Sequence, residues 1–395
     1  MQVKSFDAKS GLAFIVAFGI VSLFADMTYE GMRGIAGPFL ALLGASATAV
    51  GVIAGTGELV GYLLRLVSGR MAQKTGLYWP IALLGYVLQM TAVPLMAFSG
   101  NWWAAAGLFV LERAGRAVRN PAASTMMSRA GEHIGQGWAF GLHEAMDQTG
   151  ALVGPLIAAF VLARHHDYRL ALLWLGVPAV LTLVSITTVA ARFPYAGDVR
   201  AAAKGAASDK LSHAFWLYTG SAALFAFGFA DFSLASYHFA KAGIIGPAMI
   251  PILYAAAMGA SGLGSLLFGR WFDRRGLVVL MPGIVIATLA PALMFLGGTW
   301  IAMAGTILWG LALGVQDAIM SAAVARLVPE ADRARAYGIF PAIYGVAWFA
   351  GSALMGVLYD VSLIGLVALS AAAQLAALVP LFSALREFNA SASRS

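Results

Sequence analysis

The sequence predicts an all-α integral membrane protein with twelve transmembrane helices, arranged as two pseudo-symmetric six-helix bundles. Composition is the first reason, because 61% of the 395 residues are hydrophobic and only 11% are charged. A soluble globular protein carries about 25% charged residues. The second reason is a series of apolar segments, each long enough to cross a bilayer. The third is a loop motif that occurs once in each half of the chain.

Apolar segments of about 20 residues can be placed twelve times along the chain. They lie near residues 11–40, 47–68, 78–98, 102–128, 137–163, 169–191, 213–239, 246–268, 277–297, 299–326, 335–358 and 362–385. The one long hydrophilic interruption falls halfway. We therefore expect an N-terminal six-helix bundle (1–191), a cytoplasmic linker (192–212) and a C-terminal six-helix bundle (213–395).

The distribution of Lys and Arg predicts that both termini are cytoplasmic. If the N-terminus lies inside, seventeen of the 25 Lys and Arg residues fall on cytoplasmic segments and five fall within helices. The outer loops then hold only Arg164, Arg169 and Lys241. Because cytoplasmic loops are enriched in Lys and Arg, we expect a multi-pass protein of the plasma (inner) membrane.

Several classes of function are disfavoured by composition. The formal net charge is +7, but the basic residues are dispersed singly, which argues against nucleic-acid binding. The chain has no cysteine, so it has no structural disulfide and no thiolate metal site. It also lacks a phosphate-binding Walker loop. We expect no enzymatic activity, no cofactor and no metal site, and we expect a monomer.

The first apolar segment contains three ionisable residues, Asp26, Glu30 and Arg33. Their spacings of four and three place them within about 40° of one another on a helix, so they form one charged stripe. A charge that faces lipid costs at least about 2.5 kcal/mol, and such residues normally face a protein interior or a water-filled cavity. The stripe therefore predicts a polar pathway through the membrane.

The fourth segment carries a second charged face. Glu112, Arg116 and Arg119 repeat the spacing of four and three, and Glu112 is placed to pair with Arg116. With Arg113, the segment has three arginines for one acid, and we expect Arg119 to be the one left free. A structural salt-bridge network and a functional site are equally compatible with this pattern.

The fifth segment carries a polar face with His143, Glu144 and Asp147. A histidine beside two carboxylates is typical of a titrating site, because neighbouring charges shift its pKa across neutrality. Three residues of the second half complete the candidate set for binding substrate or protons: Asp231, Asp317 and Tyr344. We include Tyr344 because it occupies the repeat position of Asp147.

A repeat relates the two halves. Residues 69–77 align without gaps on residues 269–277, and the tripeptide Phe-Ala-Asp at 24–26 recurs at 229–231. The aligned loops contain Gly69, Arg70, Gln73 and Gly76 in the first copy, and Gly269, Asp273, Arg274 and Gly276 in the second. Two homologous six-helix halves are typical of parallel-repeat secondary transporters.

Over essentially its whole length the chain resembles the major facilitator superfamily. Residues 269–276 fit the Gly-x-x-x-Asp-Arg/Lys-x-Gly loop of that superfamily, whereas the first copy has Gln73 in place of the aspartate. In relatives this carboxylate is linked to closing the cytoplasmic side, so the resemblance implies that the eight loop residues named above form a conformational gate. The resemblance implies twelve helices in two bundles and transport along an existing gradient. Residues 150–155 partly resemble the antiporter motif of drug exporters.

Three functions follow as hypotheses. The first is a proton-coupled transporter that works by rocker-switch alternating access and exports a small organic molecule or drug, with the substrate, protons and the lipid bilayer as its partners. The second is an uptake symporter for an organic anion held by Arg116 or Arg119 through bidentate contacts. The third is a membrane assembly factor or sensor that transports nothing, although eight intramembrane carboxylates argue against a scaffold.

Overall fold

The computed structural model describes the backbone of residues 6–197, 211–328 and 333–392. It does not describe the side chains at 133, 136, 317–319, 321–322, 325, 333–334 and 388–392. Most of the predicted linker, 192–212, therefore lies outside the described residues. The described part is almost entirely helical and contains no strand.

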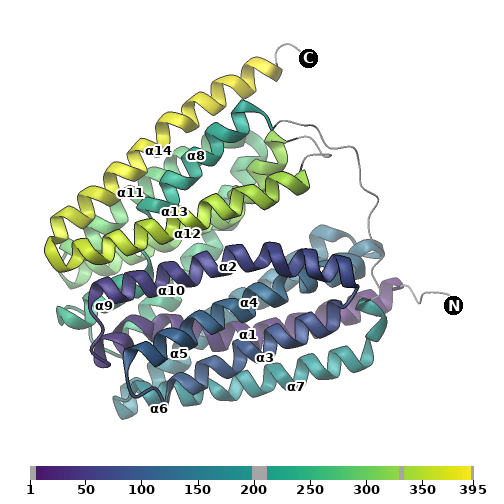
Figure 1. The fold of residues 1–395 in the computed structure, drawn as a ribbon, viewed down its shortest axis with the longest axis horizontal. Helices are drawn as coiled ribbons and strands as arrows, with labels where there is room; N and C mark the ends of the chain where they lie inside the picture. Colours follow the sequence, from purple (N-terminus) through teal and green to yellow (C-terminus); the bar gives the residue numbers. More distant parts are fainter. Residues whose placement is uncertain (1–5, 198–210, 329–332, 393–395) are drawn as a thin grey trace. The chain divides into compact units, whose positions relative to one another are not determined.

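Figure 1 shows the helices of the described residues. In the first half they are α1 (Ala8–Leu42), α2 (Ala47–Thr75), α3 (Tyr78–Met96), α4 (Trp102–Ala130), the 3-10 turn η1 (Gly131–His133), α5 (Gln136–His165), α6 (Tyr168–Trp174), α7 (Gly176–Arg192) and η2 (Pro194–Gly197). In the second half they are α8 (His213–Gly228), α9 (Phe232–Lys241), α10 (Met249–Arg275), η3 (Gly276–Val279), α11 (Leu280–Leu296), α12 (Thr299–Leu327), α13 (Arg333–Val361) and α14 (Leu363–Ala392).

Every predicted apolar segment lies on one of these helices or on a pair of them. Among the described residues, ten helical stretches are long and apolar enough to cross a membrane. One of the ten, residues 249–296, contains both α10 and α11 and so accounts for two predicted segments. Helix α4 is not among them, because its charged residues exceed what such a span tolerates. The all-α membrane fold is confirmed, whereas the count of twelve crossings is not confirmed in full.

The chain divides into two compact units. Unit 1 consists of Met1–Gly44, Val60–Ala203 and Pro247–Ala255. Unit 2 consists of Ala45–Leu59, Lys204–Gly246 and Ala256–Ser395. The start of α2 therefore belongs to unit 2, and the start of α10 belongs to unit 1. The boundaries predicted from the sequence stay a prediction.

Close helix packing in unit 1 depends on glycines. In the pair α1 and α5, a Cβ atom on Gly150 would collide with the carbonyl of Leu23, and one on Gly154 with the carbonyl of Met27. In the pair α3 and α4, a Cβ atom on Gly115 would lie 2.5 Å from the backbone nitrogen of Gln89. Small residues let helix backbones approach in this way in membranes. Polar side chains on these four helices are thereby brought close together.

Helices α2 and α10 end in the same way, as their sequence repeat predicts. Each is followed by a glycine in the left-handed region, with φ of 70° at Gly76 and 64° at Gly276. A residue with a Cβ atom is strained there. In unit 2 the second copy also has a partner on α12, because Arg326 Nη1 donates to the carbonyl of Phe272 over 3.4 Å.

The seventh predicted segment is broken. Helix α8 ends at Gly228, and Asp231 begins α9 as its N-cap, accepting a hydrogen bond from Ser233 N over 2.8 Å. Neighbouring helices of unit 2 satisfy backbone carbonyls around the break: Ser370 donates to Gly228 and Trp309 to Ala230. The break is therefore held by specific side-chain contacts.

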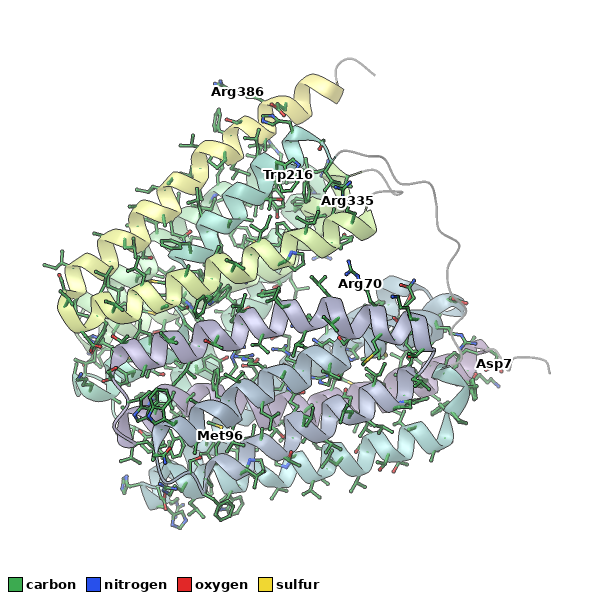
Figure 2. All side chains as sticks on the ribbon, viewed as in Figure 1. Asp7, Arg70, Met96, Trp216, Arg335 and Arg386 are labelled. Atoms are coloured by element: carbon green, nitrogen blue, oxygen red, sulfur yellow. The ribbon has the colours of Figure 1, made fainter. Side chains whose placement is uncertain are left out.

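Figure 2 shows all described side chains on the ribbon. In unit 1, Asp7 and Arg70 lie at one end and Met96 toward the other, as expected when α1, α2 and α3 alternate in direction. Asp7 caps α1 and shares a reciprocal capping box with Ser10. The Ser10 hydroxyl and N–H also both donate to the Asp7 carboxylate, and these hydrogen bonds hold the pKa of Asp7 below its usual value. Arg70 is exposed.

Candidate functional site

The candidate site lies in unit 1, where α1, α3, α4 and α5 bring most of the predicted polar residues together. The first helix contributes an ion pair, with Arg33 Nη1 3.2 Å from Glu30 Oε1. The other oxygen of Glu30 accepts a hydrogen bond from the hydroxyl of Tyr254, which lies in the part of α10 that belongs to unit 1. Both acidic members of the predicted stripe, Asp26 and Glu30, are buried, with 6% and 5% exposure.

Asp26 differs from Glu30 in its contacts. No hydrogen bond from another described residue reaches its carboxylate. The carboxylate nevertheless experiences the charges of Asp147, Arg116 and Arg119. Its Cβ atom lies 2.8 Å from the position that a Cβ atom on Gly150 would take, one turn along α5 from Asp147. Asp26 is thus a buried acid in an electrostatic cluster with Asp147.

His143 joins α5 to α1. Its Nδ1 atom lies 3.3 Å from Asp147 Oδ2, and its Nε2 atom lies 2.9 Å from the hydroxyl oxygen of Ser22. The imidazole also stacks on Phe18 of α1, with ring centroids 6.1 Å apart. The other oxygen of Asp147, Oδ1, is buried and has no hydrogen-bond partner in the described structure. The predicted pairing of an imidazole with a neighbouring acid is present.

The contacts of α4 correct two expectations. Arg119 is not free: its Nε donates to Gln89 Oε1 over 2.6 Å and its Nη1 donates to the hydroxyl of Tyr86 over 3.0 Å. Glu112 does not pair with Arg116 in the described structure. It accepts a hydrogen bond from Gln89 Nε2 over 2.9 Å and lies 3.6 Å from Nε of Arg113. Both expectations were wrong because α3 supplies partners that helix spacing on α4 does not show.

Arg116 differs from Arg113 and Arg119 in that no acid and no hydrogen-bond acceptor among the described residues meets its guanidinium. Its guanidinium lies 4.4 Å from the centroid of the Tyr29 ring, a cation–π contact. Its Nε is buried and has no hydrogen-bond partner among the described atoms, and no ion pair to Arg116 is present in the described part of the chain. Part of the side chain remains accessible. Arg116 is therefore positioned to meet an anionic group.

The site includes residues that the sequence analysis missed. Tyr86 and Gln89 of α3, Ser22 of α1 and Tyr254 of α10 all hydrogen-bond predicted site residues. One signal was available for Gln89, a strong hydrogen-bonding side chain inside the apolar segment 78–98, where an unsatisfied amide is costly. Serine and tyrosine are common in membrane helices and gave no such signal.

Other predicted residues lie apart from this cluster. Glu144 is exposed and accepts a hydrogen bond from Gln148 over 2.8 Å. Asp231 and Tyr344 belong to unit 2, where Asp231 caps α9. Tyr344 stacks on Phe340 and contacts Trp348 in a tilted arrangement. The side chain of Asp317 lies outside the described residues. Within the described ranges, no three His, Asp or Glu side chains are grouped as metal ligands would be.

The predicted gate residues lie at the ends of α2 and α10. Gln73 in unit 1 and Asp273 in unit 2 are exposed, as are Arg70 and Arg274. The glycines that end the two motifs, Gly76 and Gly276, share the left-handed conformation described above. The geometry thus supports a structural repeat, while the gating role stays a prediction.

The ten membrane-length helical stretches of the described residues indicate a multi-pass membrane protein. Its buried charged side chains are typical of a transport pathway. The family model of the Major Facilitator Superfamily matches residues 12–244 and 223–394, so the chain belongs to this superfamily and is a secondary transporter. The resemblance seen in the sequence motifs is confirmed.

Two relatives extend this result. An uncharacterized protein of Mycobacterium tuberculosis is 39% identical over 387 residues, which cover 95% of this chain and 94% of the relative. An uncharacterized MFS-type transporter of Methanocaldococcus jannaschii is 23% identical over 361 residues, covering 88% of this chain and 89% of the relative.

Solved structures share the fold. The nucleoside transporter NupG superposes with a TM-score of 0.75 at 14% identity, over 94% of this chain and 99% of that chain. The peptide transporter POT superposes with a TM-score of 0.76 at 15% identity, over 97% of this chain and 99% of that chain. At these identities the likeness shows the fold alone.

Proposed function

We propose that this chain is a proton-coupled secondary active transporter that exports a small organic molecule by alternating access. The observation that carries this proposal is the cluster of Asp26, His143 and Asp147 on the packed helices α1 and α5. Asp26 is buried and the side chains of His143 and Asp147 are partly buried, so two carboxylates and an imidazole lie in one cluster that can exchange protons as a coupled set. Histidine titrates near physiological pH, which makes such a set responsive to a proton gradient.

The charges around the cluster support a coupling role. The Asp26 carboxylate experiences the opposite charges of Arg116 and Arg119 and the like charge of Asp147. Adding one proton to this set changes the balance of attraction and repulsion among α1, α4 and α5. A proton shifts a conformational equilibrium to the extent that it binds two states with different affinity. Substrate and proton would then be exchanged across the membrane through one site.

Export across the plasma membrane, with cytoplasmic termini, is the direction and orientation that we propose. The distribution of Lys and Arg supports the orientation, and the partial antiporter-like motif at 150–155 supports the direction. In that motif Gly150 and Gly154 also have a packing role against α1. Transport assays in inside-out and right-side-out vesicles distinguish export from uptake.

Lightly buffered proteoliposomes test proton coupling. A panel of cationic, neutral and anionic metabolites is added to the pure protein, and the external pH is recorded. We expect substrate-dependent proton movement that is lost in Asp26→Asn and Asp147→Asn. Asp167→Asn is the matched control, because Asp167 caps α6 outside the cluster. Substrate transport with unchanged proton movement in both cluster variants would contradict the proposal.

A second candidate, uptake of an organic anion with protons, is supported by Arg116. Its buried Nε has no hydrogen-bond partner among the described atoms, and its guanidinium lies against the Tyr29 ring, so the Nε–H donor is available to a planar anion. Arg116→Lys keeps the charge and removes the fork-shaped donor set. If an anion is the substrate, this variant raises its KM at least about tenfold, whereas a neutral or cationic substrate is little affected.

A further inference from the structure

A continuous series of hydrogen-bonding side chains crosses unit 1 from α5 to α4 by way of α1 and α3. In order, its members are Asp147, His143, Ser22, Tyr86, Arg119, Gln89 and Glu112. In its middle are two hydroxyl groups, those of Ser22 and Tyr86, which we call the hydroxyl pair. Both side chains are buried, at 1% and 0% exposure. The proposed function assigns no role to either.

The hydroxyl pair connects a titratable imidazole to a buried arginine. Ser22 Oγ lies 2.9 Å from His143 Nε2, and the Ser22 side chain also hydrogen-bonds Tyr86. On the other side, Tyr86 accepts a hydrogen bond from Arg119 Nη1 over 3.0 Å, and the guanidinium lies 4.5 Å from the centroid of the same ring. The imidazole and the two hydroxyl groups can both donate and accept hydrogen bonds, whereas the guanidinium only donates.

The chemistry of the two ends sets the direction of the hydrogen bonds. Arginine only donates, so Tyr86 oxygen is an acceptor toward Arg119. At the other end, an ionised Asp147 only accepts, which places a proton on Nδ1 of His143. In the neutral imidazole Nε2 is then an acceptor, so Ser22 donates to it and Tyr86 donates to Ser22. In this arrangement each hydroxyl hydrogen has an acceptor.

Protonation of His143 reverses this order. Nε2 becomes a donor toward Ser22 Oγ, and the Ser22 hydroxyl hydrogen then turns toward Tyr86 oxygen. Tyr86 oxygen now receives donors from both Ser22 and Arg119, and its own hydrogen has no acceptor within the series. A buried donor without a partner is unfavourable, so the contact between Tyr86 and Arg119 is weakened.

We propose that Ser22 and Tyr86 are positioning residues that transmit the protonation state of His143 to Arg119 by reversing their two hydroxyl groups. This proposal rests on the proposed proton coupling, in which His143 is one of the proton-binding groups. It gives Arg119 a role that its hydrogen bonds alone do not suggest, because Arg119 is anchored in one protonation state and loosened in the other.

Other charged groups face the series and enter the test. Asp26 on α1 and Arg116 on α4 interact electrostatically within the cluster, and the charges of Asp147 and Asp26 also act on Tyr86. Glu144, on the same helix as His143, is hydrogen-bonded to Gln148 instead. Because Asp26 can bind a proton itself, an Asp26→Asn background separates its titration from that of His143.

Infrared difference spectroscopy observes the hydroxyl pair directly and needs no substrate. The pure protein, with isotope-labelled tyrosine, is reconstituted in liposomes and measured at about pH 8 and about pH 5.5, on either side of the ordinary histidine pKa. A tyrosine hydroxyl that changes from donor to acceptor shifts its C–O–H band. We expect this tyrosine signal in the wild type and in Asp26→Asn, and its loss in Tyr86→Phe, Ser22→Ala and His143→Gln.

Matched variants separate a relay from a merely structural role. Ser22→Thr keeps the hydroxyl and restores the signal. Tyr218→Phe removes the hydroxyl of another buried tyrosine, which donates to the Met320 carbonyl in unit 2, and leaves the signal intact. Gel filtration and circular dichroism confirm that each variant is folded.

Two results overturn the relay: a tyrosine signal that persists in folded Ser22→Ala and His143→Gln, or a wild-type spectrum without a Tyr86-dependent signal. Proton-coupled transport without the tyrosine signal rejects the relay and leaves the proposed function standing. The tyrosine signal without any substrate-driven proton movement rejects the proposed coupling and supports the relay as a proton response of the fold.

Discussion

Gln89→Leu tests the buried bridge between two charged side chains of α4. Gln89 is fully buried on α3, where it donates to Glu112 over 2.9 Å and accepts from Arg119 over 2.6 Å. Leucine is close to glutamine in size, so the substitution removes both hydrogen bonds and leaves little empty space. The two charged groups then remain buried without their bridging partner.

The expected loss of stability follows from these two contacts. A hydrogen bond to a charged group contributes about 1.5–3 kcal/mol, so losing both costs about 3–6 kcal/mol. Removing one partner from a buried ionic network costs about 3–5 kcal/mol in other proteins, which is the same range. At about 2 °C per kcal/mol, the apparent Tm falls by about 6–12 °C.

Thermal unfolding of the purified protein in detergent, followed by tryptophan fluorescence, measures this difference. Gln374→Leu is the matched control, because Gln374 is equally buried on α14 and donates one hydrogen bond, to the uncharged carbonyl of Phe225 over 3.1 Å. We expect a loss of about 1 kcal/mol there, or about 2 °C. Equal effects of the two substitutions would refute the reasoning that the charges of α4 depend on Gln89.

Three further predictions concern packing, a helix start and the gate. Gly154→Val forces a side chain against the Met27 carbonyl, and we expect a destabilisation of at least about 1–3 kcal/mol. The yield of folded protein in gel filtration should therefore fall, and a normal yield contradicts this prediction. Asp360→Ala removes the carboxylate that accepts hydrogen bonds from the Thr48 N–H (3.0 Å) and hydroxyl (2.8 Å) at the start of α2. We expect the amides at the start of α2 to exchange faster in Asp360→Ala than in Asp360→Asn, and equal exchange rates in the two variants contradict this. Gln73→Asp restores the charge of the loop motif, and we expect more outward-facing protein by single-cysteine labelling, which the cysteine-free chain permits; an unchanged labelling ratio contradicts it.

The positions of the helices could be predicted because membrane spans depend on local composition. An apolar segment of about 20 residues has few alternatives to a helix in a bilayer, since every backbone polar group must be satisfied internally. The same holds for the loop glycines Gly76 and Gly276, whose positive φ values match a repeat visible in the sequence. Such features can be predicted without knowing which residues a segment packs against.

The partners of the charged residues could not be predicted, because they come from other helices. Glu112, Arg116 and Arg119 all lie on α4, but Gln89 and Tyr86 of α3 hydrogen-bond Arg119, whereas Arg116 Nε has no hydrogen-bond partner in the described structure. The candidate site residues therefore stay a prediction, and the contacts of those on α4 depend on the packing of α3 against α4.

The repeated tripeptide Phe-Ala-Asp is a second example of structure that the local sequence does not predict. Asp26 lies within the continuous helix α1, whereas Asp231 ends a break and caps α9. Identical local sequence thus has two conformations, because tertiary contacts override local preference. In unit 2 those contacts come from side chains such as Ser370 and Trp309, far from Asp231 along the chain.

The break between α8 and α9, which side-chain hydrogen bonds stabilise, limits the exchange of corresponding helices between the two halves. Trp309 and Ser370 donate hydrogen bonds to the carbonyls of Ala230 and Gly228, which are available as acceptors because the helix is interrupted there. In a chimera with a copy of α1 in place of the seventh span, the helix would be continuous. Its backbone carbonyls would then be used within the helix, and Trp309 and Ser370 would lose their acceptors. The two halves share a sequence repeat, but their first spans are not interchangeable.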